Sequence, residues 1–189
     1  MKPVSAILLA AGKGSRAGGF KPLLPWNGES FLSKVFRSMK EAGLFGEIVV
    51  VTGFRSDRIE AELRAIGADA AFNPEFEKGM HRSIRRGLRA LRPGWSGALI
   101  AHVDQPQLEP SDYAKIVRAF QNSARSLARP CFEGRPGTPA ILGFEHLEEI
   151  EAEPDADRGC AYLFERHPRD VLSVEMDNPN CTKDFDAYP

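Results

Sequence analysis

The chain has 189 residues, a length typical of one globular domain, so we expect a single domain over residues 1–189. Hydrophobic residues make up 42% and charged residues 27%, which excludes an intrinsically disordered chain. The formal net charge is -1, so no overall basic field attracts nucleic acid or an anionic membrane, and neither is expected as a partner.

Apolar runs predict the strands of a sheet. The first run follows Lys2 and also resembles a short secretory signal, but we favour a buried strand because a glycine-rich loop with a chemical use follows it. Residues 48–51 are apolar on both faces, as in strands that helices cover on two sides. The predicted strands are residues 4–10, 47–52, 69–72, 98–103, 140–142 and 171–174.

Apolar residues at helical spacing predict helices between these strands. Ser30 is a candidate N-cap and Gly43 a candidate end of the first helix. Asp57 is a candidate start of the second, which Gly67 ends. Alternating strands and helices predict a three-layer α/β fold. The apolar stripes are Phe31, Leu32, Val35, Phe36 and Met39; Ile59, Leu63 and Ile66; Met80, Ile84, Leu88 and Leu91; and Ile116, Val117 and Phe120.

A glycine-rich loop follows the first strand. Its glycines allow backbone amides to surround a phosphate chain, and Arg16 and Lys21 add positive charge. The chain contains no Walker string G-x-x-x-x-G-K-[ST], and no acidic residue follows the second strand as a dinucleotide fingerprint requires. The alternative is a flexible surface loop with solvated charges. Two cations on one glycine loop favour triphosphate binding.

The run 98–103 delivers Asp104 to the carboxyl end of a strand, where open α/β sheets bind ligands. An aspartate before a turn often bonds only its own backbone. Beside a triphosphate, however, Asp104 is a candidate ligand of Mg2+, which prefers carboxylates together with phosphate oxygens. Asp186, or alternatively Asp184, offers a second carboxylate, although acids near a chain end are usually solvated. We therefore expect Mg2+ as the cofactor.

Seven motifs occur in order along the chain: LAAGKGSR (9–16), KPLLP (21–25), NPEFEKGMHRSIRRGL (73–88), DQP (104–106), GRPGTP (134–139), DRG (157–159) and DFDAYP (184–189). Together they resemble the MobA-like nucleotidyltransferases of molybdenum cofactor biosynthesis, in particular their cytidine-using members. The resemblance covers essentially the whole chain and implies a Rossmann-like, GT-A-type fold with a mostly parallel mixed sheet. It implies an enzyme that transfers CMP from CTP to the phosphate of molybdopterin and releases pyrophosphate, with a molybdoenzyme as recipient.

The resemblance also implies roles for residues. Arg16, Lys21 and Asp104 would be catalytic, with Lys21 stabilising charge at the reacting α-phosphate. Asp104 and Asp186 would hold the metal. The implied nucleotide-binding residues are Leu9, Ala10, Ala11, Gly12, Gly14, Ser15, Arg16, Lys21, Asn73, Gly79, Ser83 and Asp104, and the implied acceptor-side residues are Gln105, Pro106, Arg135, Gly137, Thr138 and Asp157.

Ala11 gives the Ala-Ala-Gly form of the cytidine-using relatives, so the resemblance implies CTP rather than GTP. Thr138 stands where relatives often have His, Ala161 replaces an Arg, and residues 187–188 replace Thr-Pro. The first two departures lie on the expected acceptor side. A sugar or alcohol phosphate is therefore an alternative acceptor. A non-catalytic carrier that passes nucleotide or cofactor to a partner enzyme is the alternative from another class.

Histidine is not required for this chemistry. A phosphate monoester, with a second pKa of about 6, is already a dianionic nucleophile at neutral pH, and we find no Ser–His–Asp constellation. His102 is interpreted as structural, and the other histidines have no metal-ligand spacing. They are His81, His146 and His167.

Two further residue sets have simple interpretations. The arginines of residues 82–92 are expected to form a solvated helix face, the alternative being attraction of an anionic substrate or an acidic partner. Cys131, Cys160 and Cys181 are widely spaced, which argues against disulfides and a thiolate zinc site. No apolar run approaches the ~18 residues that a bilayer requires. We expect a cytoplasmic protein.

Overall fold

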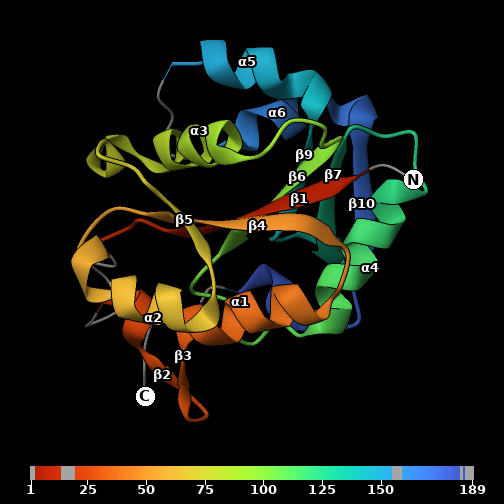
Figure 1. The fold of residues 1–189 in the computed structure, drawn as a ribbon. Coiled ribbons are helices and arrows are strands. Elements are labelled where there is room, and N and C mark those ends of the chain that lie inside the picture. Colours follow the sequence, from red (N-terminus) through yellow and green to blue (C-terminus); the bar gives the residue numbers. More distant parts are fainter. Residues whose placement is uncertain (1–2, 14–19, 155–158, 184, 186–189) are drawn as a thin grey trace.

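The computed structural model describes residues 3–13, 20–154, 159–183 and 185. In these residues a central sheet lies between two layers of helices (Figure 1). The strands are β1 (Val4–Ala10), β2 (Pro25–Trp26), β3 (Glu29–Ser30), β4 (Phe45–Thr52), β5 (Asp69–Phe72), β6 (Gly97–His102), β7 (Leu127–Phe132), β8 (Arg135–Pro136), β9 (Ala140–Gly143) and β10 (Val171–Glu175). The helices are α1 (Phe31–Glu41), α2 (Glu60–Ile66), α3 (Met80–Ala90), α4 (Pro110–Gln121), α5 (Leu147–Ala152) and α6 (Ala161–Arg166).

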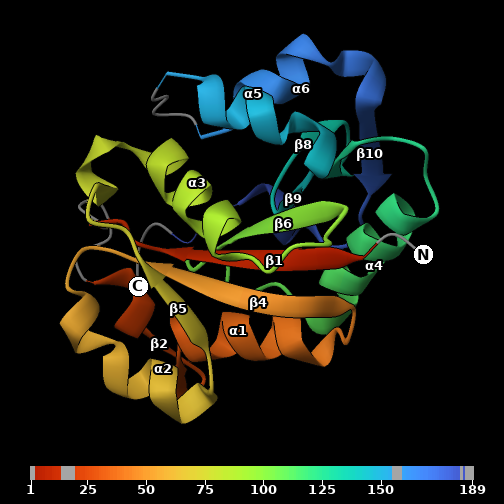
Figure 2. The same ribbon diagram turned by 45° about the horizontal axis from the view of Figure 1, so that its top comes forward.

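The main sheet has the strand order β10–β7–β9–β6–β1–β4–β5, with β8 paired to β7. β1 runs parallel to β4 and β6, and β4 runs parallel to β5, whereas β9 is antiparallel to both of its neighbours. Helices α3, α5 and α6 cover one face, and α1, α2 and α4 cover the other (Figure 1, Figure 2). The predicted three-layer α/β fold with a mostly parallel mixed sheet is confirmed. Within the described residues, no helix combines the length and apolar character needed to cross a membrane.

β1 occupies the centre of the sheet because its side chains are apolar on both faces. Ala6 and Leu8 belong to the core under α1 and α4, whereas Ile7 and Leu9 belong to the core under α3. All four are at most 8% exposed. The interpretation of residues 4–10 as a buried strand is therefore confirmed.

Several elements differ from the sequence prediction, which did not include β2, β3, β8, α5 or α6. β7 was not predicted, because Arg129 and Pro130 interrupt the apolar pattern. The proline fits because β9 pairs with β7 only up to Ala128, and the pairing with β8 starts at Cys131. The predicted capping role of Asp57 is wrong: residues 56–58 form a separate 3-10 turn, and α2 starts at Glu60 without a side-chain cap.

The arginines of α3 bind neighbouring elements, so the predicted solvated face is corrected in part. Arg85 and Arg89 both pair with Glu151 of α5, and these contacts, chiefly the hydrogen bonds from Arg89, hold the pKa of Glu151 below its usual range. Arg86 donates to the backbone carbonyl of Phe72 at 2.9 Å. These contacts fix α3 between the sheet edge and α5. Two further pairs are Arg82–Glu75 and Arg92–Glu47, both at 3.2 Å.

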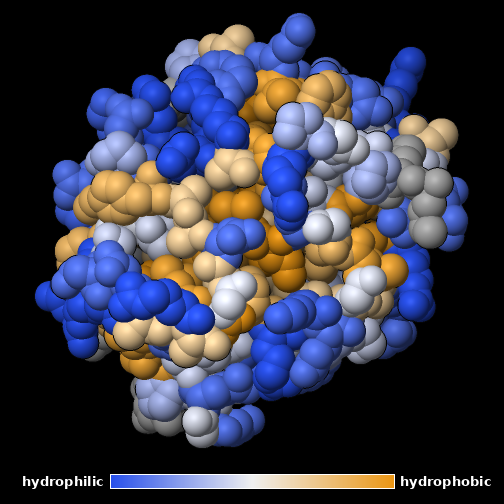
Figure 3. All heavy atoms as spheres, in the orientation of Figure 1, coloured by the Kyte–Doolittle hydropathy of each residue, from blue (hydrophilic) through white to orange (hydrophobic). Residues whose placement is uncertain are grey.

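β5 forms one edge of the sheet. Figure 3 shows apolar residues across the middle of the face seen in Figure 1, where β4 and β5 run between the helical layers. Phe72, the last residue of β5, is 49% exposed, while its carbonyl oxygen accepts the Arg86 bond. An edge strand this short, with its last carbonyl occupied, offers little template for pairing with another chain.

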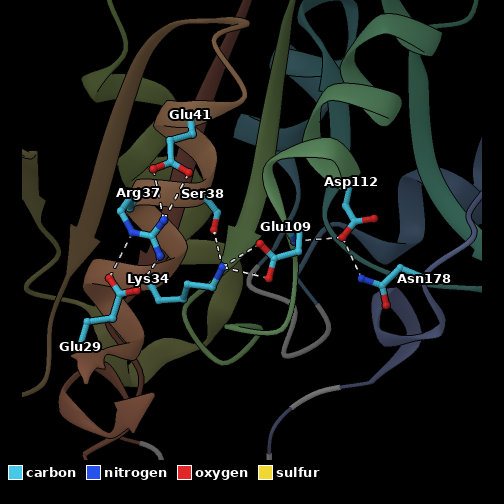
Figure 4. A network of polar contacts seen from close by, with 8 residues as sticks. All are labelled: Glu29, Lys34, Arg37, Ser38, Glu41, Glu109, Asp112 and Asn178. Carbon is cyan, nitrogen blue, oxygen red and sulfur yellow. Dashed lines mark hydrogen bonds and ion pairs between the residues drawn. The ribbon is translucent and has the colours of Figure 1, made fainter. Parts of the chain in front are cut away.

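A polar network joins α1 to the start of α4 (Figure 4). Lys34, whose side chain is only 7% exposed, donates to both carboxylate oxygens of Glu109, at 3.0 and 3.1 Å, and to Ser38. Glu109 is the N-cap residue of α4, and its backbone N–H donates to Asp112 at 2.9 Å. Asn178 donates to the same Asp112 oxygen at 2.8 Å. The network therefore fixes α1, the start of α4 and the segment after β10 to one another.

Replacing Glu109 with alanine is expected to lower the free energy of unfolding by about 2–4 kcal/mol, more than replacing Lys34 with methionine. A buried charge that loses its partner costs about 3–5 kcal/mol, and the value here is reduced because the Glu109 side chain is 58% exposed. Methionine fills the volume of Lys34, and water can solvate the carboxylate that remains. Urea unfolding of both variants measures the difference. A larger loss for Lys34→Met would contradict this expectation.

Candidate active site

The carboxyl ends of β1, β4 and β6 lie side by side, because these strands are parallel and adjacent. Ala10 pairs with Thr52 of β4, and Leu9 pairs with His102 of β6. The glycine loop after β1 and Asp104 after β6 therefore lie at the same end of the sheet, next to the carboxyl ends of the parallel strands. Open α/β sheets bind ligands at the carboxyl ends of their parallel strands.

A cavity of about 390 Å³ opens at the carboxyl ends of β1 and β6. The residues predicted to bind nucleotide that line it are Leu9, Ala10, Ala11, Gly12, Lys21, Gly79, Ser83 and Asp104. The other wall residues were not predicted to bind nucleotide, although five of them lie inside the quoted motifs: Lys13, Pro22, Phe76, Glu77 and Met80. The missed residues are Lys13, Pro22, Phe76, Glu77, Met80, His102 and Val103.

Part of the predicted site lies outside the described residues. This applies to Gly14, Ser15 and Arg16 in the first loop, and to Asp157, Asp184 and Asp186. The roles assigned to them stay predictions. Phe20, the first described residue after this loop, is buried and packs edge-on against Phe54 with 6.1 Å between ring centroids. The residues on both sides of the loop therefore lie against the sheet.

Lys21 and Asp104 form an ion pair inside the cavity. Lys21 Nζ donates to Asp104 Oδ2 at 2.7 Å, and the two side chains are only 14% and 19% exposed. The second carboxylate oxygen, Oδ1, is buried, and none of the described residues donates a hydrogen bond to it. A buried carboxylate oxygen without a donor is suited to bind a cation. The pair places a positive charge and a candidate metal ligand at one point.

The segment after β10 holds the Asp104 loop in place. The backbone N–H of Phe185 donates to the Asp104 carbonyl at 2.9 Å. Gln107 donates to the carbonyl of Lys183 at 2.8 Å. The Phe185 ring packs edge-on against Trp26 and Phe31, each with 5.4 Å between centroids. The loop that carries the candidate metal ligand is therefore anchored by a distant part of the chain.

The start of α3 forms the opposite wall. Ser83 is 4% exposed and accepts a hydrogen bond from the Asn73 side chain at 3.0 Å. Asn73 does not line the cavity, so its contact with the site passes through Ser83. Gly53 allows close packing here, because a Cβ on it would lie 2.6 Å from Cβ of Phe76 and 2.9 Å from Cβ of Ala11. Gly53 therefore lies between the loop after β1 and the turn before α3, and its lack of a side chain lets both pack closely against it.

A second cavity, of about 470 Å³, adjoins the first and shares Met80 and His102 with it. His102, interpreted from the sequence as structural, therefore lies in the walls of both. Burial raises the pKa of the Cys160 thiol in this cavity to about 12, which excludes a reactive thiolate at neutral pH. The remaining lining residues are Ile84, Ile100, Arg129, Pro136, Gly137, Thr138, Ala140, Leu142, Ala161, Phe164, Glu165, Cys181 and Thr182.

The predicted acceptor-side residues are only partly brought together. Gly137 and Thr138 line the second cavity, whereas Gln105 and Pro106 are buried outside both cavities. Arg135 is exposed on β8 and lines neither. The two departures from the family pattern, at Thr138 and Ala161, both lie in the second cavity.

Arg129 and Glu165 are the charged residues of this cavity, and neither belongs to a motif recognised in the sequence. Arg129 carries the positive charge. Its guanidinium lies over the Phe164 ring, 5.2 Å from the centroid. Its Nε is buried, and no described residue accepts a hydrogen bond from it. A buried donor of this kind favours an anionic or carbonyl group in the cavity.

The sequence spacing of the histidines did not predict that two of them lie together in the structure. His146 and His167 lie with 4.8 Å between ring centroids, and Glu149 lies beside them. His81 instead contacts the Tyr162 hydroxyl at 3.4 Å and lies outside this group. His146 and Glu149 are only three residues apart, and the fold brings His167, which follows α6, against them.

A model of the MobA-like NTP transferase domain family matches residues 6–171 of the chain. The molybdenum cofactor cytidylyltransferase of Escherichia coli (strain K12) is 28% identical over 189 residues. That match covers 99% of this chain and 93% of the relative.

Solved structures show the same fold. The Rv0371c protein of Mycobacterium tuberculosis H37Rv has a TM-score of 0.84 at 24% identity, over 98% of this chain and 94% of that chain. The same protein has been solved in complex with manganese. A nucleotidyl transferase from Methanothermobacter thermautotroptrophicus has a TM-score of 0.79 at 23% identity, over 94% of this chain and 88% of that chain. The expected nucleotidyltransferase fold is confirmed.

Proposed function

Because the chain belongs to the MobA-like NTP transferase domain family, we propose that it transfers CMP from CTP to a phosphorylated acceptor and releases pyrophosphate. That it is a nucleotidyltransferase follows from the family match and its relatives. The nucleotide, the acceptor and the metal are the proposed part. The observation that carries the proposal is the Lys21–Asp104 pair, 2.7 Å apart in a cavity that the loop after β1 helps to line.

Asp104 is proposed to bind Mg2+, with Asp186, or alternatively Asp184, as the second carboxylate. The buried Oδ1 of Asp104, which receives no hydrogen bond from the described residues, supports this assignment. The bond from Phe185 to the Asp104 carbonyl supports it too, because Phe185 is the neighbour of both other aspartates. When bound, Mg2+ would supply charge neutralisation on the triphosphate and the leaving pyrophosphate. The manganese complex of Rv0371c agrees with a divalent cation in this fold.

Lys21 is proposed to face the reacting α-phosphate, while the loop after β1, including Arg16, holds the remaining phosphates. Joining two anions concentrates negative charge in the transition state, and fixed positive groups lower that barrier electrostatically. The acceptor phosphate is already a dianion near neutral pH, so the chain need not supply a general base. Positioning of the two substrates therefore accounts for the rest of the catalysis.

The second cavity is proposed to bind the acceptor, and its walls favour a molybdopterin-type ring over a sugar phosphate. Ile84, Leu142 and Phe164 present apolar surface, which suits a flat ring better than a polyhydroxylated sugar. Arg129 supplies positive charge, as an anionic acceptor requires. The cavity adjoins the nucleotide cavity at Met80 and His102, so the two substrates would meet there.

The test of this function is pyrophosphate release by the purified chain with Mg2+ and each of CTP, GTP, ATP and UTP. Each nucleotide is combined with molybdopterin and with simple sugar and alcohol phosphates. We expect release with CTP and molybdopterin, and none when the acceptor is omitted. Turnover with a sugar phosphate but not with molybdopterin would contradict the proposed acceptor.

CTP is expected to give a kcat/KM at least about tenfold higher than GTP, a difference of ~1.4 kcal/mol. The expectation rests on Ala11, which is 3% exposed in the wall of the nucleotide cavity, and on the cytidylyltransferase relative. A pocket shaped for a pyrimidine excludes a purine or leaves its polar edge unpaired. Steady-state kinetics at one Mg2+ concentration compare the two. Equal or reversed values would contradict the assignment of the base.

Arg129→Gln is expected to raise the KM for the acceptor by about 10- to 100-fold while leaving the KM for CTP within about twofold. Loss of hydrogen bonds to a charged group costs roughly 1.5–3 kcal/mol, which corresponds to that range. Arg135→Gln is the matched control, because Arg135 is exposed and lines neither cavity. A larger effect at Arg135 would place the acceptor outside the second cavity.

A further inference from the structure

We propose that His146, Glu149 and His167 form a binding site for a divalent transition metal, separate from the Asp104 site. His146 ends the 3-10 turn Phe144–His146, Glu149 lies on α5, and His167 follows α6. One ligand atom from each lies within 4.8 Å of the others. None of the three lines either cavity, so this site is independent of the proposed function.

Hydrogen bonds hold all three side chains in place. His146 is 6% exposed, and its Nε2 lies 2.8 Å from Ser126 Oγ. Metal-binding histidines usually have one ring nitrogen fixed by such a partner, which orients the other toward the metal. His167 Nε2 lies 2.7 Å from Glu149 Oε2, so these two groups face each other. A metal would replace the proton between them.

Arg166 contacts Glu149 without occupying the carboxylate oxygen that faces His167. Its guanidinium bonds the other oxygen of Glu149, Oε1, at 3.0 Å, and pairs with Glu153 through two bonds of 2.6 and 3.0 Å. Glu153 therefore offsets much of the positive charge next to the site. Glu149 Oε2 remains directed at His167, where it can bind a cation.

The donor set selects the class of metal. Two imidazole nitrogens and one carboxylate oxygen suit Zn2+ and neighbouring transition metals, whereas Mg2+ requires oxygen ligands in octahedral geometry. The Asp104 site offers carboxylate oxygen and is proposed for Mg2+. The two sites therefore differ in selectivity. The alternative for the cluster is an ordinary Glu149–His167 hydrogen bond without metal.

A metal here would stabilise one wall of the second cavity through α6. Cys160, Ala161, Phe164 and Glu165 of this region line the second cavity, and His167 follows directly after α6. A metal that joins His167 to α5 and to the turn before it would fix that wall. The role is structural, because none of the three ligands reaches the proposed reaction centre.

Isothermal titration of the full chain with ZnCl2, after removal of metal by EDTA and without nucleotide, tests the proposal. We expect one Zn2+ per chain, retained in millimolar Mg2+. Zinc K-edge X-ray absorption is expected to show nitrogen and oxygen ligands without sulfur. Absence of Zn2+ binding by the wild-type chain would overturn the proposal.

Variants locate the metal. His167→Gln and Glu149→Gln are expected to weaken Zn2+ binding by roughly 100-fold or more, and Ser126→Ala by about tenfold, since even supporting groups change metal affinity about 10–100-fold. Glu148→Gln, an exposed carboxylate on the same helix, is the matched control and is expected to bind as the wild type does. Circular dichroism of the metal-free variants confirms that they are folded. Zn2+ binding that survives His167→Gln but is lost in Asp104→Asn would overturn the assignment.

Discussion

Replacing Asp104 with asparagine is expected to lower kcat by about a thousandfold or more while the fold stays intact. Asparagine has almost the same size, and its amide oxygen can still accept the bond that Lys21 donates at 2.7 Å. It is neutral, however, and binds a divalent cation poorly. Loss of a metal ligand removes several kcal/mol of transition-state stabilisation, and a thousandfold effect corresponds to ~4 kcal/mol. Pyrophosphate release at saturating CTP and acceptor measures it.

Asp177→Asn is the matched control for this variant. The Asp177 side chain is 97% exposed and pairs with Lys115 at the surface, so its loss is expected to leave turnover within about twofold. Circular dichroism establishes that both variants are folded. If folded Asp104→Asn keeps more than about a tenth of the wild-type rate, a loss below ~1.4 kcal/mol, then Asp104 is not the metal ligand.

Lys21→Ala is expected to lower kcat by roughly 10²–10³-fold with a much smaller change in the Kd for CTP. The Lys21 side chain is only 14% exposed, and inside the cavity its charge is less screened by water than at the surface. Charge that matters mainly in the transition state affects kcat more than ground-state binding. Titration of CTP with Mg2+ and the pyrophosphate assay measure the two quantities separately.

Lys13→Ala is the control for Lys21. Lys13 lines the same cavity, but its side chain is 52% exposed and pairs with Glu77, so changes within about twofold are expected. An unchanged kcat for Lys21→Ala would exclude the proposed role. Loss of CTP binding with kcat retained would assign Lys21 to ground-state binding of the nucleotide alone.

The sequence predicted the centre of the fold well, because β1 and β4 contain short runs that are apolar on both faces. Such runs are typical of central strands covered by helices on both sides. It failed at β7, where Arg129 and Pro130 break the pattern and the strand depends on which neighbours it pairs with. It also missed α5 and α6, which have six residues each and therefore span less than two helical turns. Tertiary pairing defines these elements more than local pattern does.

The same distinction applies to the sites. The meeting of the first loop with Asp104 could be predicted, since parallel strands end at one edge of a sheet. The pairing of Lys21 with Asp104 could not, because it depends on the path of the chain between them. Neither Arg129 nor the His146–His167 cluster lies in a motif that sequence reasoning recognised. Both sites depend on the packing of α5 and α6 against the sheet, which local sequence patterns do not define.

The network around Lys34 also determines when the loop that carries Asp104 loses its conformational entropy. Asp104 lies between β6 and Glu109, and Lys34 fixes the side chain of Glu109 with bonds of 3.0 and 3.1 Å. Between them, Gln105 and Leu108 are each only 1% exposed. Ordering a residue costs roughly 1–2 kcal/mol, and for this loop that cost falls on folding. In the proposed function, the binding energy of the substrates is therefore not consumed in ordering the loop and remains available to align the reacting phosphates.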